Sequence, residues 1–325
     1  MAQVSRGPDW TFKGSSVLVT GASGFIGTHL CRSLSRLGAR VSGTYLHDIP
    51  AGDHAEWIRL DLTDLNMVRT AFQSIRPAFV FHLAGSVLGN RGLDAVLPTF
   101  QNNLAGSISV MIAAHESGCC ERLIITNSME EPERGDPNPV PSSPYAASKF
   151  ASSAYARMFH ALYGLPIVIA RVFMVYGPGQ KDHRKLVPYT ILQALDGNTP
   201  ELSSGVRMID WIHVNDVVDG LLQMGCKAGL EGETVDLGSG HPHSIKEIVE
   251  KILGSIDPEI KGQFGAEADR PMEQQRIADT RATKDKLGWQ ARIELDQGLA
   301  KTIAWYREYR DIWRQDHRDR DHGDD

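Results

Sequence analysis

Short apolar runs alternate with longer helical patterns over the first half of the chain. The apolar runs predict strands at Val17–Val19, Arg40–Tyr45, Trp57–Leu60, Phe79–Leu83, Arg122–Thr126 and Pro166–Ala170. The segments between them predict helices at Ile26–Leu37, Leu65–Ile75, Leu93–Glu116 and Tyr145–Tyr163. Such alternation is typical of a parallel sheet with helices on its faces. We therefore expect an α/β fold with a doubly wound parallel sheet.

The pattern loosens after Gly177-Pro178-Gly179, where prolines and glycines break the chain into shorter elements. We expect a smaller C-terminal cap there, interrupted near Trp211–Val214 by a strand that returns to the sheet. The expected organisation is an N-terminal extension over 1–14, a first domain over 15–178 with a returning segment near 209–238, and a cap over 179–208 and 239–312. No apolar residue follows Trp313, so residues 313–325 are expected to be disordered.

Composition narrows the class of protein. The net charge is −6 and no basic stripe is present, which argues against nucleic acid as a partner. No run of about 18 apolar residues predicts a membrane span, and the N-terminal residues lack a secretory pattern, so we expect a cytoplasmic protein. The four cysteines (Cys31, Cys119, Cys120 and Cys226) show no metal-binding spacing, and no metal site is expected.

A glycine pattern joins the first predicted strand to the first predicted helix. Gly21, Gly24 and Gly27 follow Thr20 at three-residue spacing. Glycines permit a tight turn and close backbone approach, and the helix start offers free N–H groups to a pyrophosphate. The pattern predicts a dinucleotide site, although such turns also occur as plain connectors.

A tyrosine and a lysine stand one helical turn apart later in the chain. Ser143-Pro144 is a good helix start, which places Tyr145 and Lys149 on one helix face. A nearby ammonium favours the phenolate and is expected to lower the pKa of Tyr145, making it a base. Taken alone, the pair also fits an ordinary surface helix.

Together, the glycine pattern and Tyr-x-x-x-Lys resemble the short-chain dehydrogenase/reductase superfamily, in particular its extended branch of NAD-dependent nucleotide-sugar epimerases and dehydratases. Further marks are Asp61-Leu62, His82-Leu83-Ala84-Gly85 and Trp211-Ile212-His213. The resemblance implies a Rossmann-type sheet, a substrate-binding cap and a homodimer that pairs Leu93–Glu116 with Tyr145–Tyr163. It also implies that the cofactor contacts Gly21, Ser23, Gly24, Phe25, Ile26, Gly27, Asp61, Leu62, Leu83, Ala84, Gly85, Asn103, Tyr145 and Lys149.

The end of the second predicted strand departs from the family pattern. Tyr45 replaces the carboxylate expected for the adenosine ribose, and no arginine stands there for a 2′-phosphate. Asp48 could serve a slightly longer turn. We therefore expect NAD as the cofactor.

The residues after the fifth predicted strand bear on the reaction. Ser128 stands where the family places a hydroxyl that binds the reacting sugar oxygen. In 4,6-dehydratases an acid and a base follow, and here Met129 and Glu130 occupy those positions. Glu130 could remove the C5 proton next to a C4 ketone, while Glu131, a water or Glu130 itself would have to assist the leaving C6 hydroxyl. Glu130 and Glu131 could equally form a solvated acidic turn.

The methionine at the acid position resembles the UDP-N-acetylglucosamine 5,6-dehydratases of tunicamycin-type antibiotic biosynthesis. Our first hypothesis is therefore an NAD-dependent nucleotide-sugar dehydratase, 4,6 or 5,6, with catalytic residues Ser128, Glu130, Tyr145 and Lys149. The second is a nucleotide-sugar 4-epimerase or 4-ketoreductase. The third is a non-catalytic dinucleotide sensor, against which the Tyr/Lys pair argues.

The resemblance also implies a set of substrate contacts. Arginines suit diphosphate oxygens because a planar guanidinium can bind two of them. Two positions depart from the family pattern: Ile209 replaces the arginine expected before Asp210, and Met174 replaces an expected asparagine. The implied substrate-binding residues are Ser128, Met129, Phe173, Lys185, Leu186, Arg207 and Arg270.

Overall fold

The computed structural model describes residues 12–47, 49–50, 52–87, 91–132 and 138–321. The chain divides into two compact units. The first comprises 1–171, 218–235 and 281–289, and the second comprises 172–217, 236–280 and 290–325. The segment 209–217, which the sequence placed with the first domain, groups with the second unit.

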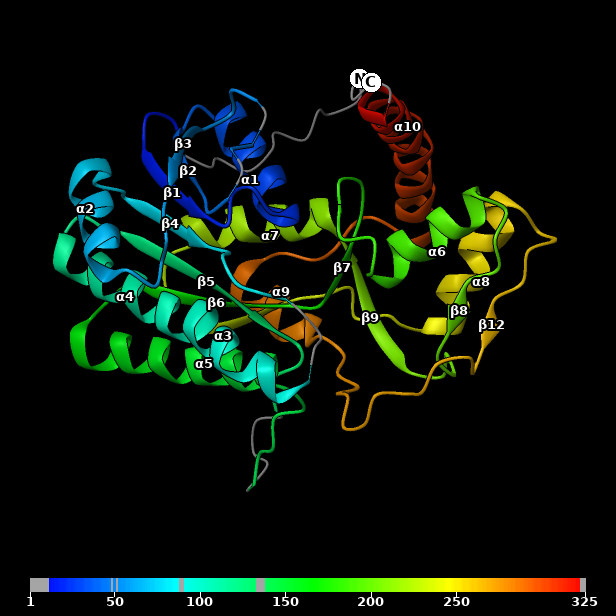
Figure 1. The fold of residues 1–325 in the computed structure, drawn as a ribbon. Helices are drawn as coiled ribbons and strands as arrows, with labels where there is room; N and C mark the ends of the chain where they lie inside the picture. The colour runs from blue at the N-terminus through cyan, green and yellow to red at the C-terminus, as the bar shows by residue number, and fades with distance from the viewer. Residues whose placement is uncertain (1–11, 48, 51, 88–90, 133–137, 322–325) are drawn as a thin grey trace, which may run out of the picture. The chain divides into compact units, whose positions relative to one another are not determined.

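A seven-stranded sheet confirms the predicted doubly wound fold (Figure 1). Its strand order is β10-β6-β5-β4-β1-β2-β3. The pairs β1–β2, β1–β4, β2–β3 and β4–β5 are all parallel. The strands are β1 (Ser16–Thr20), β2 (Arg40–Tyr45), β3 (Glu56–Arg59), β4 (Phe79–His82), β5 (Arg122–Ser128), β6 (Ile167–Val172) and β10 (Thr234–Leu237). Because strand order reverses beside β1, the carboxyl ends of β1 and β4 form the usual ligand-binding edge of such a sheet.

The helices of this fold begin at residues suited to capping. Asp64 accepts the N–H groups of Asn66 and Met67 at the start of α2, and Ser143 accepts that of Ala146 at the start of α5. The helices are α1 (Phe25–Arg36), α2 (Leu65–Ile75), α4 (Gly106–Ser117), α5 (Pro144–Tyr163), α7 (Val214–Cys226) and α9 (Thr280–Leu287).

One predicted helix is divided. Instead of one helix over Leu93–Glu116, the chain forms η1 (Leu93–Ala95), α3 (Val96–Thr99), a π-helical segment η2 (Phe100–Ala105) and then α4. A π-helical turn rotates the side chains relative to a regular helix. Periodicity alone does not reveal this change.

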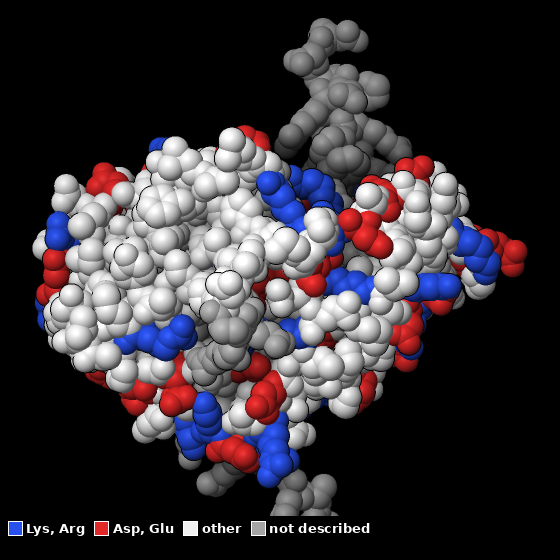
Figure 2. Space-filling model, turned by 90° about the horizontal axis from the view of Figure 1, so that it is seen from below, with Lys and Arg blue, Asp and Glu red and all other residues white. Residues whose placement is uncertain are grey.

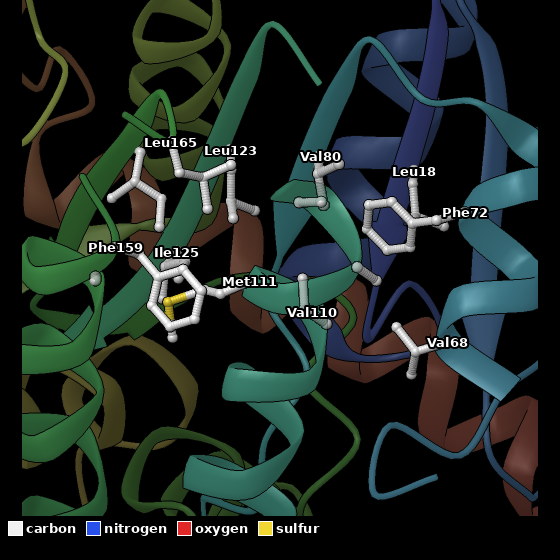
Figure 3. Packing of buried hydrophobic residues seen from close by; sticks show 14 of the residues in the cluster. Leu18, Val68, Phe72, Val80, Val110, Met111, Leu123, Ile125, Phe159 and Leu165 are labelled. Carbon is white, nitrogen blue, oxygen red and sulfur yellow. The ribbon is translucent and has the colours of Figure 1, made fainter. Parts of the chain in front are cut away.

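Alternating residues of the strands build the two faces of the sheet. On one face, Leu18 of β1 and Val80 of β4 join a buried cluster with Phe72 of α2, Met111 of α4 and Phe159 of α5 (Figure 3). This packing shows that α2, α4 and α5 cover the same face. The alternation follows from the two-residue period of a strand.

The opposite face is lined by aromatic rings. The rings of Phe12 and Phe79 meet edge-on with centroids 5.0 Å apart, and Phe12 also lies 6.2 Å from Phe81. A Cβ added to Gly225 of α7 would lie 2.8 Å from the Phe12 ring. The small residue therefore lets α7 pack close to this face.

The second unit contains two small sheets, β11-β9-β7 and β12-β8. Its strands are β7 (Met174–Tyr176), β8 (Glu201–Leu202), β9 (Met208–His213), β11 (Pro242–Ser244) and β12 (Gln263–Phe264). Its helices are α6 (Leu186–Leu195), α8 (Ile245–Ile256) and α10 (Leu295–Asp321). A capping box between Ser244 and Glu247 begins α8.

Two expectations about this region are wrong. The strand near Trp211–Val214 does not return to the large sheet, because β9 pairs with β7 and β11, and β10 takes the place beside β6 instead. The hydrophobic pattern predicts the strand β9 but not which strands it pairs with. Within the tail expected to be disordered, residues 313–321 belong to α10, which continues to Asp321, and residues 322–325 lie outside the described part of the chain.

Among the described residues, no helix is long and apolar enough to cross a membrane. No group of three or more histidine, cysteine or acidic side chains in this part of the chain could hold a metal ion.

Candidate active site

The glycine turn between β1 and α1 is packed so tightly that side chains are excluded. Gly21 has a φ of +67°, and a Cβ on it would lie 2.7 Å from the main-chain nitrogen of Ala84. A Cβ on Gly27 would collide with the carbonyl oxygen of Gly21 and lie 2.8 Å from the Cα of Ala22. The glycines therefore bring β1, α1 and the residues after β4 together.

The start of α1 is open to a ligand. Gly24 caps the helix without a side-chain hydrogen bond, and the first turn carries no acidic residue. Ser23 and Gly24 are exposed, and Phe25 and Ile26 are half-buried. Free N–H groups at a helix start suit a pyrophosphate, so this turn fits the phosphates of a dinucleotide.

A buried histidine joins this turn to the next strand. The Thr20 hydroxyl and His82 Nδ1 lie 2.7 Å apart, and His82 Nε2 lies 2.8 Å from the Ser107 hydroxyl. Ser107 donates to the carbonyl of Asn103 over 2.5 Å. Burial, together with the smaller effect of the nearby positive charge of Lys149, lowers the pKa of His82 to about 3, so the ring is neutral. Sequence reasoning noted His82 only as a family mark; its role here is to connect β1, β4 and the η2–α4 helix.

Asn103 occupies the π-helical segment and reaches the residues after β4. Its Oδ1 accepts the N–H of Ser86 over 2.6 Å, and its Nδ2 donates to the carbonyl of Ser86 over 2.9 Å. A Cβ on Gly85 would lie 3.2 Å from Asn103 Oδ1 and 3.7 Å from Lys149 Nζ. The structure therefore brings Gly85, Asn103 and Lys149 together, beside Leu83 and Ala84, as the cofactor hypothesis requires.

The predicted adenosine end is only partly described. Asp61 accepts the N–H and hydroxyl of Thr63 over 2.9 and 2.7 Å, and Leu62 is buried. Asp48 lies outside the described residues. The fold also places Arg59 opposite Tyr45, with its Nε donating to the carbonyl of Leu46 over 3.2 Å. Arg59 becomes a neighbour of Tyr45 because β2 pairs with β3. The residues next to Tyr45 in the sequence include no arginine.

The lysine of the Tyr/Lys pair is buried and held by the main chain. Lys149 is 5% exposed and donates from Nζ to the carbonyl of Thr126, at the end of β5, over 2.7 Å. Burial lowers the pKa of Lys149 to about 8, while the negative charge of Glu131 acts to raise it. The ammonium is therefore close to its titration range near neutral pH.

The tyrosine differs from the sequence expectation. Burial raises the pKa of Tyr145 to about 12; a hydrogen bond with Ser128 lowers it, and the charges of Glu130 and Glu131 raise it. The protein alone does not provide the lowering of the Tyr145 pKa that we expected from Lys149; burial is the largest cause that acts on it. A positive charge brought by a ligand next to the phenol would favour the phenolate.

A short turn carries the residues that follow β5. The N–H of Glu130 donates to the Ser128 hydroxyl over 3.2 Å, and that of Glu131 donates to the Ser128 carbonyl over 3.2 Å. Glu130 is half-buried, whereas Met129 and Glu131 are buried at 2% and 6% exposure. Ser128, Glu130 and Tyr145 thus share one corner of the site, and Met129 packs into the protein.

The second unit gathers predicted substrate contacts around two loops. Burial lowers the pKa of Lys185, Asp182 raises it, and the nearby Arg270 lowers it again, so the two cations lie near each other. Arg207 donates to the carbonyl of Gln274 over 2.7 Å and pairs with Glu273 over 3.1 Å. These contacts tie Arg207 to the segment that follows Arg270.

Asp210, Phe173 and Leu186 also belong to this unit. Asp210 is fully buried and accepts the N–H groups of Ser239, Gly240 and Ala278 over 2.7, 2.9 and 3.0 Å. Phe173 is buried, and a Cβ on Gly238 would lie 3.0 Å from its ring. Leu186 is half-buried at the start of α6.

Comparison with known proteins agrees with this geometry. The model of the "NAD dependent epimerase/dehydratase family" matches residues 17–238. A UDP-glucose 4-epimerase of Mycolicibacterium smegmatis is 30% identical, with 89% of this chain and 98% of the relative covered. The chain belongs to the NAD-dependent epimerase/dehydratase family.

Two other relatives of this family match over most of the chain. A probable dTDP-glucose 4,6-dehydratase of Sinorhizobium fredii is 29% identical, with 90% of this chain and 93% of the relative covered. The structure of MoeE5 in complex with UDP-glucuronic acid and NAD is 30% identical with a TM-score of 0.80, and 90% of this chain and 99% of that chain are covered. As a member of this family, the protein is an NAD-dependent enzyme, which confirms the cofactor predicted from the sequence.

The residues present fit that cofactor. The glycine turn leaves no room for a Cβ at Gly21 or Gly27, and the N-terminal end of α1 is free of acidic side chains. Glu131 is the residue of this site that sequence reasoning left out of its site prediction. It follows Glu130 directly, and this acidic pair gives no signal that Glu131 is buried and hydrogen-bonded to Ser153 of α5.

Proposed function

We propose that the protein is an NAD-dependent nucleotide-sugar dehydratase. The supporting observation is the corner formed by Ser128, Glu130 and Tyr145. Ser128 hydrogen-bonds Tyr145 and accepts the N–H of Glu130, and the charge of Glu130 acts on the Tyr145 phenol. Glu130, the proposed base for the C5 proton, therefore lies beside Ser128 and Tyr145, which are proposed to act on the C4 hydroxyl.

In this proposal each side chain has one task. Bound NAD supplies the oxidant for C4 of the sugar. Tyr145 takes the proton of the C4 hydroxyl, Ser128 hydrogen-bonds the C4 oxygen, and Lys149 supplies positive charge. The resulting C4 ketone acidifies C5, so Glu130 can remove the C5 proton and pass it to the C6 oxygen, which leaves as water.

The final step decides the product. Return of hydride to C6 gives a 6-deoxy-4-keto sugar, and return to C4 gives a 5,6-ene. Met129 is buried and has no proton to give to the leaving hydroxyl. We therefore include the 5,6-dehydratase reaction, on a UDP-hexosamine as in antibiotic biosynthesis, within the proposal.

The proposed substrate is a nucleoside diphosphate sugar. Lys185, Arg207 and Arg270 supply three cations within the second unit, where Lys185 and Arg270 are near neighbours. Guanidinium and ammonium groups suit diphosphate oxygens. Relatives named for UDP-glucose and dTDP-glucose support the same substrate class.

A nucleotide-sugar 4-epimerase is the second candidate. Met129 in the acid position favours it, and so does the 30% identity to a UDP-glucose 4-epimerase. Epimerisation needs Tyr145, Lys149 and Ser128 but gives Glu130 no task. Glu130 therefore separates the two reactions.

The experiment that tests the dehydratase is the variant Glu130→Gln. We expect it to oxidise C4, seen as absorbance of the reduced nicotinamide, but to accumulate the 4-keto sugar without loss of water. Glu121→Gln, an exposed glutamate of the first unit, serves as the matched control. Unchanged product formation by Glu130→Gln would contradict the assignment.

We also propose a homodimer formed through the η1–α3–η2 segment and α5. Leu93, Leu97 and Phe100 are 89%, 61% and 50% exposed, and Leu162 of α5 is 68% exposed. Figure 2 shows a broad uncharged area on the left of the face seen from below, the side on which Figure 1 draws α4 and α5. Apolar side chains gathered on one surface favour association with a second copy.

For location, we propose the cytoplasm. Cys31, Cys119, Cys120 and Cys226 form no disulfide, although Cys119 and Cys120 are neighbours. Free thiols suit a reducing compartment.

A further inference from the structure

Glu131 is a buried carboxylate beside the proposed catalytic residues and has no task in the reaction described above. Both of its carboxylate oxygens lie within hydrogen-bond distance of the Ser153 hydroxyl, at 3.1 and 2.9 Å. Its Oε1 also accepts the N–H of Ser128 over 3.4 Å. The Asn127 amide donates to the same Ser153 hydroxyl. These contacts join the end of β5 and the turn that follows it to α5.

We propose that Glu131 is a positioning residue of the oxidation step, which clamps the Ser128 main chain and fixes a negative charge next to Lys149 and Tyr145. The inference rests on the proposed roles of Tyr145 and Lys149, which the dehydratase and epimerase reactions share. Glu131 is 6% exposed and held by protein groups, so it acts through its neighbours and not on the sugar.

The charged groups around Glu131 come from three elements. Lys149 and Tyr145 face it from α5, Arg171 from β6, and Glu130 from its own turn. Burial raises the pKa of Glu131, while Ser153, Arg171 and Lys149 lower it. Lys149 also acts on His82 of β4, whose pKa is lowered to about 3, so His82 adds no charge here.

The sign of the effect on the pair follows from these charges. The carboxylate of Glu131 raises the pKa of Tyr145 because it opposes the phenolate, and it raises the pKa of Lys149 because it favours the ammonium. Removing this charge should lower both pKa values. The charge of Glu130 also raises the pKa of Tyr145, whereas Glu131 is the carboxylate that raises the pKa of Lys149.

The test is the pH dependence of C4 oxidation in Glu131→Gln, followed as nicotinamide reduction in a single turnover. The acid limb reports ionisation of Tyr145, and the alkaline limb reports loss of the Lys149 proton. We expect both limbs to move to lower pH by ~1 unit, because a charge partner in a buried site shifts a pKa by about that amount or more. Glu130→Gln is the matched comparison and should move the acid limb only. Glu131→Asp, which keeps the charge, should restore the wild-type limbs.

A merely structural role predicts a different result. It would lower the rate and the melting temperature while leaving both limbs in place, and this outcome would overturn the proposal. If Glu131→Gln does not fold, Ser153→Ala carries the test, because the Ser153 hydroxyl contacts both carboxylate oxygens and its loss frees the carboxylate from its fixed position next to Lys149 and Tyr145. We expect Ser153→Ala to shift both limbs in the same direction by a smaller amount; unmoved limbs would overturn the proposal.

An activity-independent measurement separates this inference from the proposed function. The phenolate absorbance of the wild type minus that of Tyr145→Phe reports Tyr145 directly. Repeated in the Glu131→Gln background, the difference should appear at lower pH even if no tested sugar reacts. A phenolate transition at the wild-type pH would contradict the role of Glu131, whereas failure of dehydration alone would contradict only the proposed function.

Discussion

Lys149 Nζ donates to the main-chain oxygen of Thr126 over 2.7 Å, so the ammonium is anchored to the end of β5 as well as to its own helix. The same Thr126 donates its hydroxyl to the carbonyl of His82 over 3.0 Å. β4, β5 and α5 are thereby joined at the edge where the nicotinamide end of the cofactor is expected. The position of Lys149 is thus set by the sheet.

This anchoring predicts a pH limit on catalysis. The pKa of Lys149 is lowered to about 8, so its charge is complete well below that pH and is lost as pH rises through it. When the positive charge of bound NAD has lowered the pKa of Tyr145 below that of Lys149, the rate of C4 oxidation should therefore fall with an alkaline limb near pH 8. Lys149→Met should remove this limb and reduce the rate on the order of 10² to 10⁴-fold. If the alkaline limb is unchanged in Lys149→Met, a group other than Lys149 causes it.

Loss of the phenol should affect chemistry more than binding. Tyr145→Phe removes the hydroxyl that hydrogen-bonds Ser128 but preserves the ring. We expect turnover to fall by roughly 10² to 10⁴-fold, the usual size of a lost acid or base group. Calorimetric titration should give an NAD affinity close to that of the wild type. A near-normal rate would remove Tyr145 from the catalytic set.

Two glycines provide a matched test of the cofactor turn. A methyl group at Gly27 would meet the Gly21 carbonyl, whereas a methyl group at Gly254, within α8, meets nothing within 4 Å. Gly27→Ala should destabilise the fold by about 1–3 kcal/mol and weaken NAD binding. Gly254→Ala should stabilise it by up to about 1 kcal/mol. Thermal denaturation with and without NAD measures both, and equal effects of the two variants would contradict the packing argument.

The proposed dimer can be tested at its exposed apolar surface. Leu97→Asp or Phe100→Asp should convert a dimer to a monomer in sedimentation velocity, because a buried charge without a partner opposes association. Val206→Asp, also at an exposed apolar position, is the control and should leave the dimer intact. A monomeric wild type, or dimeric Leu97→Asp and Phe100→Asp variants, would contradict the proposal.

Local sequence predicts the parts of this site that depend on local geometry. The glycine turn follows from three glycines between a strand and a helix, and the placement of Tyr145 and Lys149 follows from their i, i+4 spacing after a Ser-Pro start. Parallel strand order then places Thr20, His82 and Ser128 at strand ends. Each inference needs only the neighbouring residues.

Properties that depend on tertiary packing were not predictable in this way. Glu131 is buried because Ser153 of α5 lies against it, and Arg59 approaches Leu46 because β3 pairs with β2. The raised pKa of Tyr145 results from burial, which the spacing of Tyr145 and Lys149 does not contain. The sheet that β9 joins was not predictable either. The large sheet and the small sheet of the second unit can both accept a strand with the same hydrophobic pattern.

The most direct test of the central claim is the product formed by the wild-type enzyme in deuterated water. A panel of UDP-, dTDP-, GDP- and CDP-hexoses, analysed by mass spectrometry and NMR, covers the proposed substrate class. The account predicts a sugar that has lost one water and carries either deuterium at C5 or a 5,6-ene, because Glu130 removes the C5 proton. A sugar inverted at C4, with no water lost and no deuterium at C5, would contradict it.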